Sequence, residues 1–207
     1  MSMHTNLDAE RQCRMFCRPI CTGLGELAVR PIGPADAAIA QAFVAGLSGT
    51  SRYFRFFQVM TSLSPAMLDR FTRVDQVTQV ALAAVTDLEG KPGMVAEARY
   101  AVAADGRSAE FALVVTDAWQ RRGLATQLMT TLERIAVAAG ITRLTAECLA
   151  ANEGFVGFAR SLGFRVRPDA GDRTLLQIEK SIGEPFRTGN HGYANERAGG
   201  WQIASVL

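Results

Sequence analysis

The stretch Gln120-Arg121-Arg122-Gly123-Leu124-Ala125 lies between an apolar segment, residues 111–115, and a segment with helical periodicity, residues 122–139. A helix N-terminus presents N–H groups without an intrahelical acceptor and about half a unit of positive charge, so it attracts anions. The small residues of the stretch let a ligand approach the backbone, and its two arginines add positive charge. The stretch therefore predicts an anion-binding site at the start of a helix.

The small residues Gly123 and Ala125 could also serve only to pack the first turn of a helix tightly. The flanking sequence distinguishes this alternative from an anion-binding site. The segment 122–139 has apolar residues at spacings of three and four and is followed by Gly140, as in an amphipathic helix with a glycine after its end. Farther along, Asn152 precedes Gly163-Phe164. A P-loop is excluded because Gly-Lys-Ser/Thr is missing, and a Rossmann turn because Gly-x-Gly-x-x-Gly is missing.

The other segments predict one α+β domain at residues 25–182, between an N-terminal extension, 1–24, and a glycine-rich C-terminal tail, 183–207. Three consecutive strands with short turns form an antiparallel meander, and the crossover through the long helix makes its flanking strands parallel. The expected strands are 26–30, 77–86, 94–103, 108–116, 141–149, 164–167 and 173–179, and the expected helices are 34–47, one from 51, 65–73, 122–139 and 152–162.

The length, composition and net charge of the chain favour a folded domain and disfavour nucleic-acid-binding and membrane-spanning proteins. The chain has 207 residues, 48% hydrophobic and 20% charged, which suits one folded domain. A formal net charge of +2 provides too little positive charge to neutralise many phosphates, so we expect no nucleic-acid partner. The longest apolar runs are far shorter than the roughly 20 residues of a membrane helix, and the N-terminus has no apolar signal region. We therefore expect a cytoplasmic protein without a membrane partner.

Three cysteines, Cys13, Cys17 and Cys21, recur at intervals of four residues and suggest a metal or redox protein as an alternative class. A structural zinc site needs four ligands, usually in two pairs, and the two histidines, His4 and His191, lie near opposite ends of the chain. We therefore expect reduced cysteines and no metal. The alternative predicts a stoichiometric bound metal ion.

At this point the sequence resembles the GCN5-related N-acetyltransferase (GNAT) superfamily. Gln120-x-x-Gly123-x-Ala125 looks like its pyrophosphate-binding signature, which is Gln or Arg, two residues, Gly, one residue, and Gly or Ala. Asn152 followed by Gly163-Phe164 looks like its next motif, in the helix that flanks the pantetheine arm. The resemblance covers nearly the whole domain, and the two motifs together are more specific than either alone.

The resemblance implies a GNAT fold, with a mixed, mostly antiparallel sheet flanked by helices, in which acyl-CoA lies in a central V between the strand before the turn and the strand after the long helix. It implies acetyl-CoA as the cosubstrate. The implied cofactor contacts are the backbone of Leu113, Val114 and Val115 to pantetheine, the residues Gln120, Arg121, Arg122, Gly123, Leu124 and Ala125 to the diphosphate, and Asn152 beside the pantetheine arm.

A narrower resemblance concerns the acceptor. Ser51-Arg52-Tyr53-Phe54-Arg55-Phe56-Phe57 looks like a segment of bacterial Pat-type protein lysine acetyltransferases, although it also reads as an amphipathic helix. Those relatives also have Ala-Glu where Ala109-Glu110 stands. The resemblance implies N-acetyl transfer to protein lysine. A small-molecule amine acceptor and a catalytically silent acyl-CoA sensor stay open as alternatives, and so does a homodimer.

Amide formation requires a neutral amine, so a general base has to remove a proton from a lysine with a pKa of about 10.4. Glu110, next to the strand 111–115, is the candidate base, and Glu97 on the neighbouring strand is second. A strand N–H near Val114 is the candidate oxyanion donor. Many superfamily members have a Tyr that protonates the leaving thiolate, and here that position is Ala159. We expect direct transfer without an acyl-enzyme at Cys148.

Overall fold

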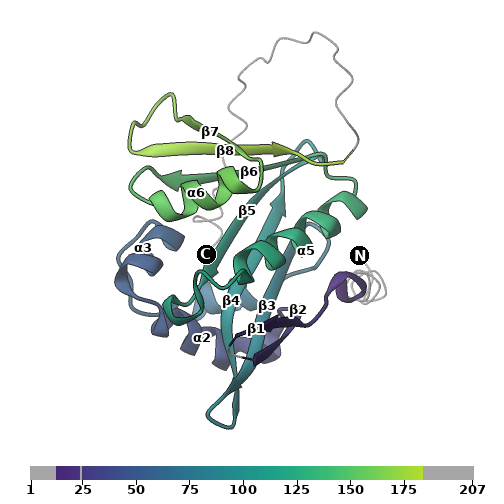
Figure 1. The fold of residues 1–207 in the computed structure, drawn as a ribbon, viewed down its shortest axis with the longest axis vertical. Coiled ribbons are helices and arrows are strands. Elements are labelled where there is room, and N and C mark those ends of the chain that lie inside the picture. Colours follow the sequence, from purple (N-terminus) through teal and green to yellow (C-terminus); the bar gives the residue numbers. More distant parts are fainter. Residues whose placement is uncertain (1–12, 24, 184–207) are drawn as a thin grey trace.

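The computed structural model describes residues 13–23 and 25–183, which form one mixed sheet with helices on both of its faces (Figure 1). Its strands are β1 (Ile20–Thr22), β2 (Gly25–Pro31), β3 (Gln79–Leu88), β4 (Lys91–Val102), β5 (Ser108–Val115), β6 (Arg143–Leu149), β7 (Arg165–Pro168) and β8 (Leu175–Ser181). Its α-helices are α2 (Ala37–Gly46), α3 (Gly49–Phe56), α4 (Pro65–Thr72), α5 (Leu124–Ala138) and α6 (Glu153–Ser161), and its 3-10 helices are η1 (Pro34–Asp36) and η2 (Asp117–Trp119).

The sheet has the strand order β1-β2-β3-β4-β5-β6-β8-β7. All neighbouring strands are antiparallel except β5 and β6, which are parallel on either side of the crossover through α5. The predicted α+β class and the mixed, mostly antiparallel sheet are therefore confirmed. The domain limits at 25 and 182 stay a prediction; β1, within the predicted extension, pairs with β2.

The parallel pair separates at the centre of the sheet. Its register runs only from Ser108 opposite Arg143 to Glu110 opposite Thr145, although β5 continues to Val115 and β6 to Leu149. The two strands therefore leave a V between their carboxyl ends, and this opening is the central feature of the fold.

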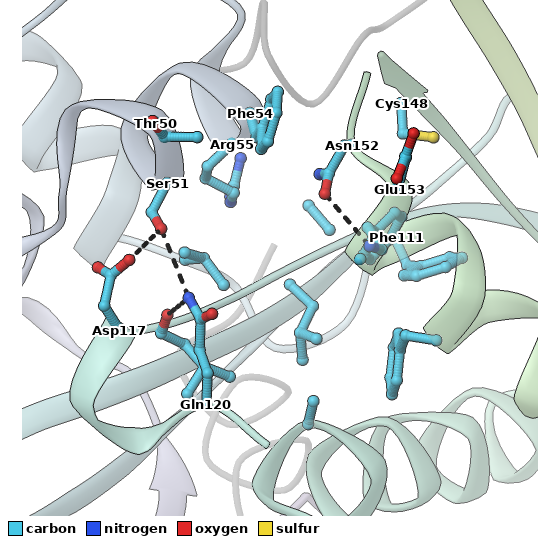
Figure 2. Close-up of a pocket in the computed structure, with 18 of the residues that line it drawn as sticks. Thr50, Ser51, Phe54, Arg55, Phe111, Asp117, Gln120, Cys148, Asn152 and Glu153 are labelled. Atoms are coloured by element: carbon cyan, nitrogen blue, oxygen red, sulfur yellow. Dashed lines mark hydrogen bonds between the residues drawn. The ribbon is translucent and has the colours of Figure 1, made fainter. Parts of the chain in front are cut away.

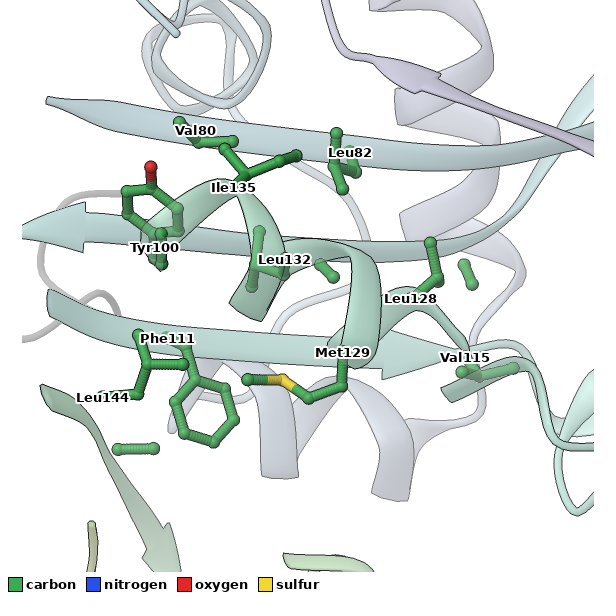
Figure 3. Close-up of a cluster of buried hydrophobic side chains, with 14 of the residues drawn as sticks. Val80, Leu82, Tyr100, Phe111, Val115, Leu128, Met129, Leu132, Ile135 and Leu144 are labelled. Atoms are coloured by element: carbon green, nitrogen blue, oxygen red, sulfur yellow. The ribbon is translucent and has the colours of Figure 1, made fainter. Parts of the chain in front are cut away.

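Two buried apolar layers hold the sheet between the helices. On one face, residues of α5 such as Leu128, Leu132 and Ile135 pack against the strands (Figure 3). On the other face, α2, α3 and α4 form a second cluster around Phe43, Phe56 and other apolar side chains. Because side chains alternate along a strand, Phe111 and Val115 of β5 face the α5 layer, and Glu110, Ala112 and Val114 face the α2–α4 layer.

The helix after the sequence motif begins later than predicted. Its first residue is Leu124 and not Arg122, because Arg121 and Gly123 have left-handed φ angles of 58° and 77°. Such angles interrupt a right-handed helix, and they are unfavourable for a residue with a side chain such as Arg121. The predicted glycine after its end is confirmed, since Gly140 has a φ of 81°.

Within residues 13–23 and 25–183, no helix combines the length and the apolar character that crossing a membrane requires.

Candidate functional site

A cavity of about 560 Å³ opens in the V between β5 and β6 (Figure 2). The sequence motif, α3, β5, the end of β6 and the start of α6 all contribute to its walls. Among the predicted site residues, its walls include Glu110, Leu113, Val114, Val115, Gln120, Arg121, Gly123, Ala125 and Asn152. The fold thus gathers around one cavity predicted site residues that lie up to 42 positions apart in sequence, from Glu110 to Asn152.

Arg122 and Leu124 are the two predicted contacts whose side chains lie elsewhere. Arg122 donates from Nε to the Ala118 carbonyl at 3.2 Å, and Leu124 is 1% exposed in the core below α5. Leu124 can therefore serve a ligand only through its peptide N–H. The sequence motif did not distinguish backbone contacts from side-chain contacts. An anion-binding turn uses its peptide N–H groups, whereas an apolar side chain in the same turn, such as Leu124, packs in the core.

The first turn of α5 has the unpaired N–H groups that an anion requires. The first bond from the turn into the helix runs from the Gln127 N–H to the Gly123 carbonyl at 3.1 Å. The N–H groups of residues 124, 125 and 126 precede it, so they have no intrahelical acceptor. Arg121 adds a positive charge at the cavity wall. This part of the cavity suits a diphosphate.

Alternate peptide groups of β5 point toward β4 and toward the V. The Thr116 N–H donates to the Val95 carbonyl at 2.9 Å, and the Ala103 N–H donates to the Ser108 carbonyl at 2.8 Å. These two bonds identify the residues of β5 whose peptide groups bond to β4. By the alternation of antiparallel pairs, the peptide groups of Val114 point to β4, and those of Leu113 and Val115 point to the V. β6 no longer pairs there, so Leu113 and Val115 offer a free strand edge.

Gln120 turns its side chain away from the diphosphate region. Its Nε2 donates to the Val115 carbonyl at 3.1 Å and lies 3.5 Å from Ser51 Oγ (Figure 2). Val115 thereby keeps only its N–H for a ligand. The glutamine thus fixes the end of β5 relative to the turn.

Asp117 links the start of α3 to the same turn. Its carboxylate accepts from the Ser48 N–H at 3.1 Å, from Ser48 Oγ at 2.9 Å and from Ser51 Oγ at 3.1 Å. Burial on its own would raise the pKa of Asp117, but these hydrogen bonds outweigh it and hold the pKa below its usual range. We call Ser48, Ser51 and Asp117 the Asp117 clamp. It persists at neutral pH and is lost as the pH falls through that lowered pKa.

Asp117→Ala should loosen α3 without unfolding the sheet. Loss of the clamp should lower the local opening free energy of α3 by about 1 kcal/mol, so amides of residues 49–56 should exchange about fivefold faster by mass spectrometry. The matched control is Asp87→Ala, which removes a carboxylate that accepts from the Gly90 N–H in the β3–β4 turn. Unchanged exchange in Asp117→Ala, or equal acceleration in the control, would show that the clamp does not hold α3.

Below the cavity, two arginines share one carboxylate. Arg55 donates from Nε and Nη2 to Glu97 Oε2 at 3.4 and 3.3 Å, and Arg99 donates from Nε to Glu97 Oε1. Glu97 is 0% exposed, and each arginine is 5% exposed. Glu97 is therefore a buried ion-pair partner and does not line the cavity, whereas Glu110 does. Of the two candidate bases, Glu110 has the access that proton transfer requires.

Comparison with known proteins decides the family. The Acetyltransferase (GNAT) family matches residues 56–164. Acetyltransferase PA5475 of Pseudomonas aeruginosa is 30% identical over 148 residues, which cover 72% of this chain and 80% of the relative. The chain belongs to the GNAT acetyltransferase family. It is thus an enzyme of the acetyl-CoA-dependent N-acyltransferase class, as the sequence motifs predicted.

Two solved structures support the GNAT fold. The GNAT domain of S. lividans PAT is 30% identical, has a TM-score of 0.73, and the match covers 81% of this chain and 98% of that domain. A putative acetyltransferase of Salmonella typhimurium, yncA, solved with acetyl-CoA, is 18% identical with a TM-score of 0.61; the match covers 79% of this chain and 98% of that one. The second likeness shows the fold alone.

Among the described residues that line the α6 side of this GNAT cavity, none is a tyrosine. Asn152 begins α6, and its Oδ1 accepts from the Phe155 N–H at 3.2 Å (Figure 2). Ala159, at the position where many GNAT enzymes have a tyrosine, is 1% exposed in the core. Cys148 lines the cavity, and burial raises its pKa to about 11, which leaves little thiolate for nucleophilic attack.

No group of three or more potential metal ligands occurs within residues 13–23 and 25–183. Cys13 is buried and donates to the Gln76 carbonyl at 3.9 Å, Cys17 donates to the Cys13 carbonyl at 3.3 Å, and Cys21 is exposed. Cys13 and Cys17 therefore donate to different carbonyls, and Cys21 is exposed on β1.

Sequence reasoning missed Asp117 and the role of Arg55. Two charged residues, Glu97 and Arg99, interrupt the apolar stretch 94–102 of β4, and Arg55 lies among aromatic residues on a short helix. Such isolated charges are the signal of a buried ion-pair network, because an unpaired charge would be too costly in the core.

Proposed function

We propose that this GNAT acetyltransferase transfers the acetyl group of acetyl-CoA to the side-chain amine of protein lysine, with Glu110 as the general base. One observation carries the proposal: Glu110 lines the same cavity as the turn 120–125 and the free edge of β5. A base, an anion-binding helix start and an open strand edge are thus brought within one volume of about 560 Å³.

The residues of the cavity fit acetyl-CoA, which supplies an acetyl thioester. The diphosphate lies against the N–H groups of residues 124–126, with Arg121 adding charge. The pantetheine amides extend along β5 and take the Leu113 carbonyl and one of the two free N–H groups, of Leu113 or Val115, which leaves the other N–H for the thioester carbonyl. Val114 and the side chains of Arg122 and Leu124 are not needed for these contacts. Asn152 faces the pantetheine arm from the start of α6.

The reaction is a direct transfer. Glu110 accepts a proton from the lysine ammonium, and the neutral amine nitrogen forms a bond to the acetyl carbon. The carbon–sulfur bond then breaks, the second proton of the attacking nitrogen passes to the released thiolate to give the CoA thiol, and Glu110 returns its proton to solvent. The peptide N–H of Leu113 or Val115 stabilises the oxyanion, because the Val114 N–H points to β4. The thiolate leaves without a tyrosine acid, since a thiol with a pKa of about 8.5 is a good leaving group near neutral pH.

The proposal of protein lysine as the acceptor is based on the sequence and position of α3. The segment 51–57, which resembles Pat-type lysine acetyltransferases, forms the cavity wall through Ser51, Phe54, Arg55 and Phe57. The 30% identity to the GNAT domain of S. lividans PAT agrees with this resemblance. Phe54 and Phe57 give this wall the apolar character that suits the methylene chain of a lysine side chain.

Labelled acetyl-CoA should separate the candidate acceptors. The enzyme is incubated with dialysed lysate protein and, separately, with the low-mass filtrate of the same lysate. We expect label on protein lysines, located by peptide mass spectrometry, and none without enzyme. Label confined to the low-mass fraction would contradict the lysine assignment and favour a small amine acceptor. Acetyl-CoA binding without turnover in either fraction would indicate a silent sensor.

Gly123→Ala should weaken acetyl-CoA binding. A side chain at a φ of 77° is strained by roughly 1–2 kcal/mol, and relief of this strain would reorient the N–H groups of the turn. We expect the KM for acetyl-CoA to rise by about tenfold, equivalent to about 1.4 kcal/mol.

Gly140→Ala provides the matched control for this variant, because Gly140 has a φ of 81° at the other end of α5 and does not line the cavity. Both variants should lose similar stability, measured by thermal unfolding, and only Gly123→Ala should change the KM. An unchanged KM in Gly123→Ala would contradict the placement of the diphosphate.

A further inference from the structure

The network below the cavity contains one more positive charge than negative charge. Arg55 and Arg99 both bind the carboxylate of Glu97, and all three side chains are almost fully buried. Arg99 has further partners on the side away from the cavity, because it donates to the Phe71 carbonyl at 3.1 Å and lies 4.2 Å above the Phe71 ring. A buried excess charge is unfavourable unless another carboxylate balances it.

Arg55 is the member of the network that reaches the cavity. It comes from α3, lines the cavity together with Glu110, and points into the space between α3 and β5 (Figure 2). Glu110 faces the same side of the sheet as Glu97 and Arg99, which lie on the adjacent strand β4 opposite Val114 and Ala112. The Glu110 carboxylate is therefore in position to balance the excess charge.

The charged groups around Arg55 change its pKa in the directions that this arrangement predicts. Burial lowers the pKa of Arg55, and the nearby charge of Arg99 acts in the same direction. The carboxylates of Glu97 and Glu110 act in the opposite direction. Attraction between Arg55 and Glu110 is reciprocal, so Arg55 stabilises the ionised form of Glu110.

We propose that Arg55, anchored by Glu97, is a positioning residue that keeps the Glu110 carboxylate ionised and facing the cavity. This inference rests on the proposed function of Glu110 as the base. A base can accept a proton only in its ionised form, and in a cavity with apolar walls a carboxyl group without a cationic neighbour tends to be neutral. Arg55 would thus set the pH range in which the enzyme works.

Other charged groups lie around Glu110 on the neighbouring elements. Glu97 and Arg99 come from β4, Arg143 and Glu147 from β6, Arg121 from the turn before α5, and Glu153 from the start of α6. Arg143 Nη2 lies 3.7 Å from Asp105 Oδ2. Glu147 accepts from Gln177 Nε2 at 2.6 Å, and both it and Glu153 are acidic. Arg55 and Arg121 both line the cavity, and the charge of Arg55 interacts with that of Glu110. Removal of Arg55 should therefore raise the pKa of Glu110 more than removal of Arg99 does.

The test is a direct titration of Glu110, which does not depend on an acceptor. Protein labelled with 13C at the glutamate carboxyl carbon is titrated by NMR, and Glu110→Gln assigns the resonance. In Arg55→Met we expect the midpoint of the Glu110 titration to rise by about one pH unit, because a nearby opposite charge lowers a carboxyl pKa by roughly 1–3 units and its loss reverses that effect.

Two further variants make the result specific. Arg55→Lys keeps the charge and should keep the midpoint within about 0.3 units of the unsubstituted enzyme. Arg99→Met removes the other cation and leaves a one-to-one Arg55–Glu97 pair, just as Arg55→Met leaves an Arg99–Glu97 pair. It should change thermal stability to a similar extent but move the midpoint much less. Both methionine variants are thus expected to fold.

An unchanged Glu110 midpoint in Arg55→Met, or an equal rise in Arg99→Met, would overturn the inference. The outcome for the proposed function is separate: full activity of Glu110→Gln in the labelled acetyl-CoA assay would overturn the role of Glu110 as base, whatever the titration shows.

Discussion

Glu110→Gln is expected to reduce kcat by a factor of about 10²–10⁴ and to leave the KM for acetyl-CoA nearly unchanged. The amide is similar in size and shape to the carboxylate but cannot accept the proton of the amine, and general base catalysis typically contributes a factor of that size. Glu110 stands at the Ala109-Glu110 start of the V, away from the turn that holds the diphosphate, so cofactor binding should survive. Initial rates with labelled acetyl-CoA and lysate protein, at several acetyl-CoA concentrations, measure both quantities.

The control for this variant is Glu26→Gln, an exposed glutamate on β2 that does not line the cavity. It should retain full activity. If Glu110→Gln keeps a kcat within about threefold of the unsubstituted enzyme, Glu110 is not the base. If its KM for acetyl-CoA rises strongly while kcat is retained, Glu110 contributes to cofactor binding instead of proton transfer.

Glu97→Gln should cause the largest loss of stability. Glu97 is 0% exposed and is the carboxylate that Arg55 and Arg99 share, so its neutralisation would leave two buried guanidinium groups without this shared partner. Breaking a buried ion pair on one side costs about 3–5 kcal/mol. We expect a loss of that size in the free energy of unfolding, measured by urea denaturation monitored by circular dichroism.

The matched control is Glu133→Gln, which breaks the partly exposed pair with Lys180 Nζ at 2.8 Å. It should cost about 1 kcal/mol or less because solvent screens that pair. The double variant Glu97→Gln with Arg55→Met should recover part of the loss, since one of the two uncompensated cations is then absent. Equal stability of Glu97→Gln and Glu133→Gln would show that the buried network does not contribute as its geometry indicates.

The sequence predicted the fold well because its main elements have local signals. The spacing of Leu124, Leu128 and Leu132 follows from burial of one helix face, and Ser64 with Pro65 indicated the start of α4, where Ser64 Oγ accepts from the Met67 N–H at 3.3 Å. The parallel pair β5 and β6 followed from the crossover through α5. The predicted roles of the site residues stay predictions.

The geometry of the V was not readable from the sequence. Residue types do not show that the pairing of β5 and β6 stops after Glu110 and Thr145, because this depends on packing of α6 and α3 around the opening. The left-handed φ of 58° at Arg121 was also hidden, since arginine has no preference for that conformation. The pairing of Arg55 with Glu97 joins residues 42 positions apart, which no local pattern reveals.

A crystal structure of the enzyme with acetyl-CoA tests the central claim most directly, because the claim places cofactor and base in one cavity. We predict that the diphosphate contacts the N–H groups of residues 124–126, that the thioester carbonyl accepts from the Leu113 or Val115 N–H, and that the acetyl carbon faces Glu110. A thioester bound outside the V of β5 and β6, or an acetyl group with the sheet between it and Glu110, would contradict the account.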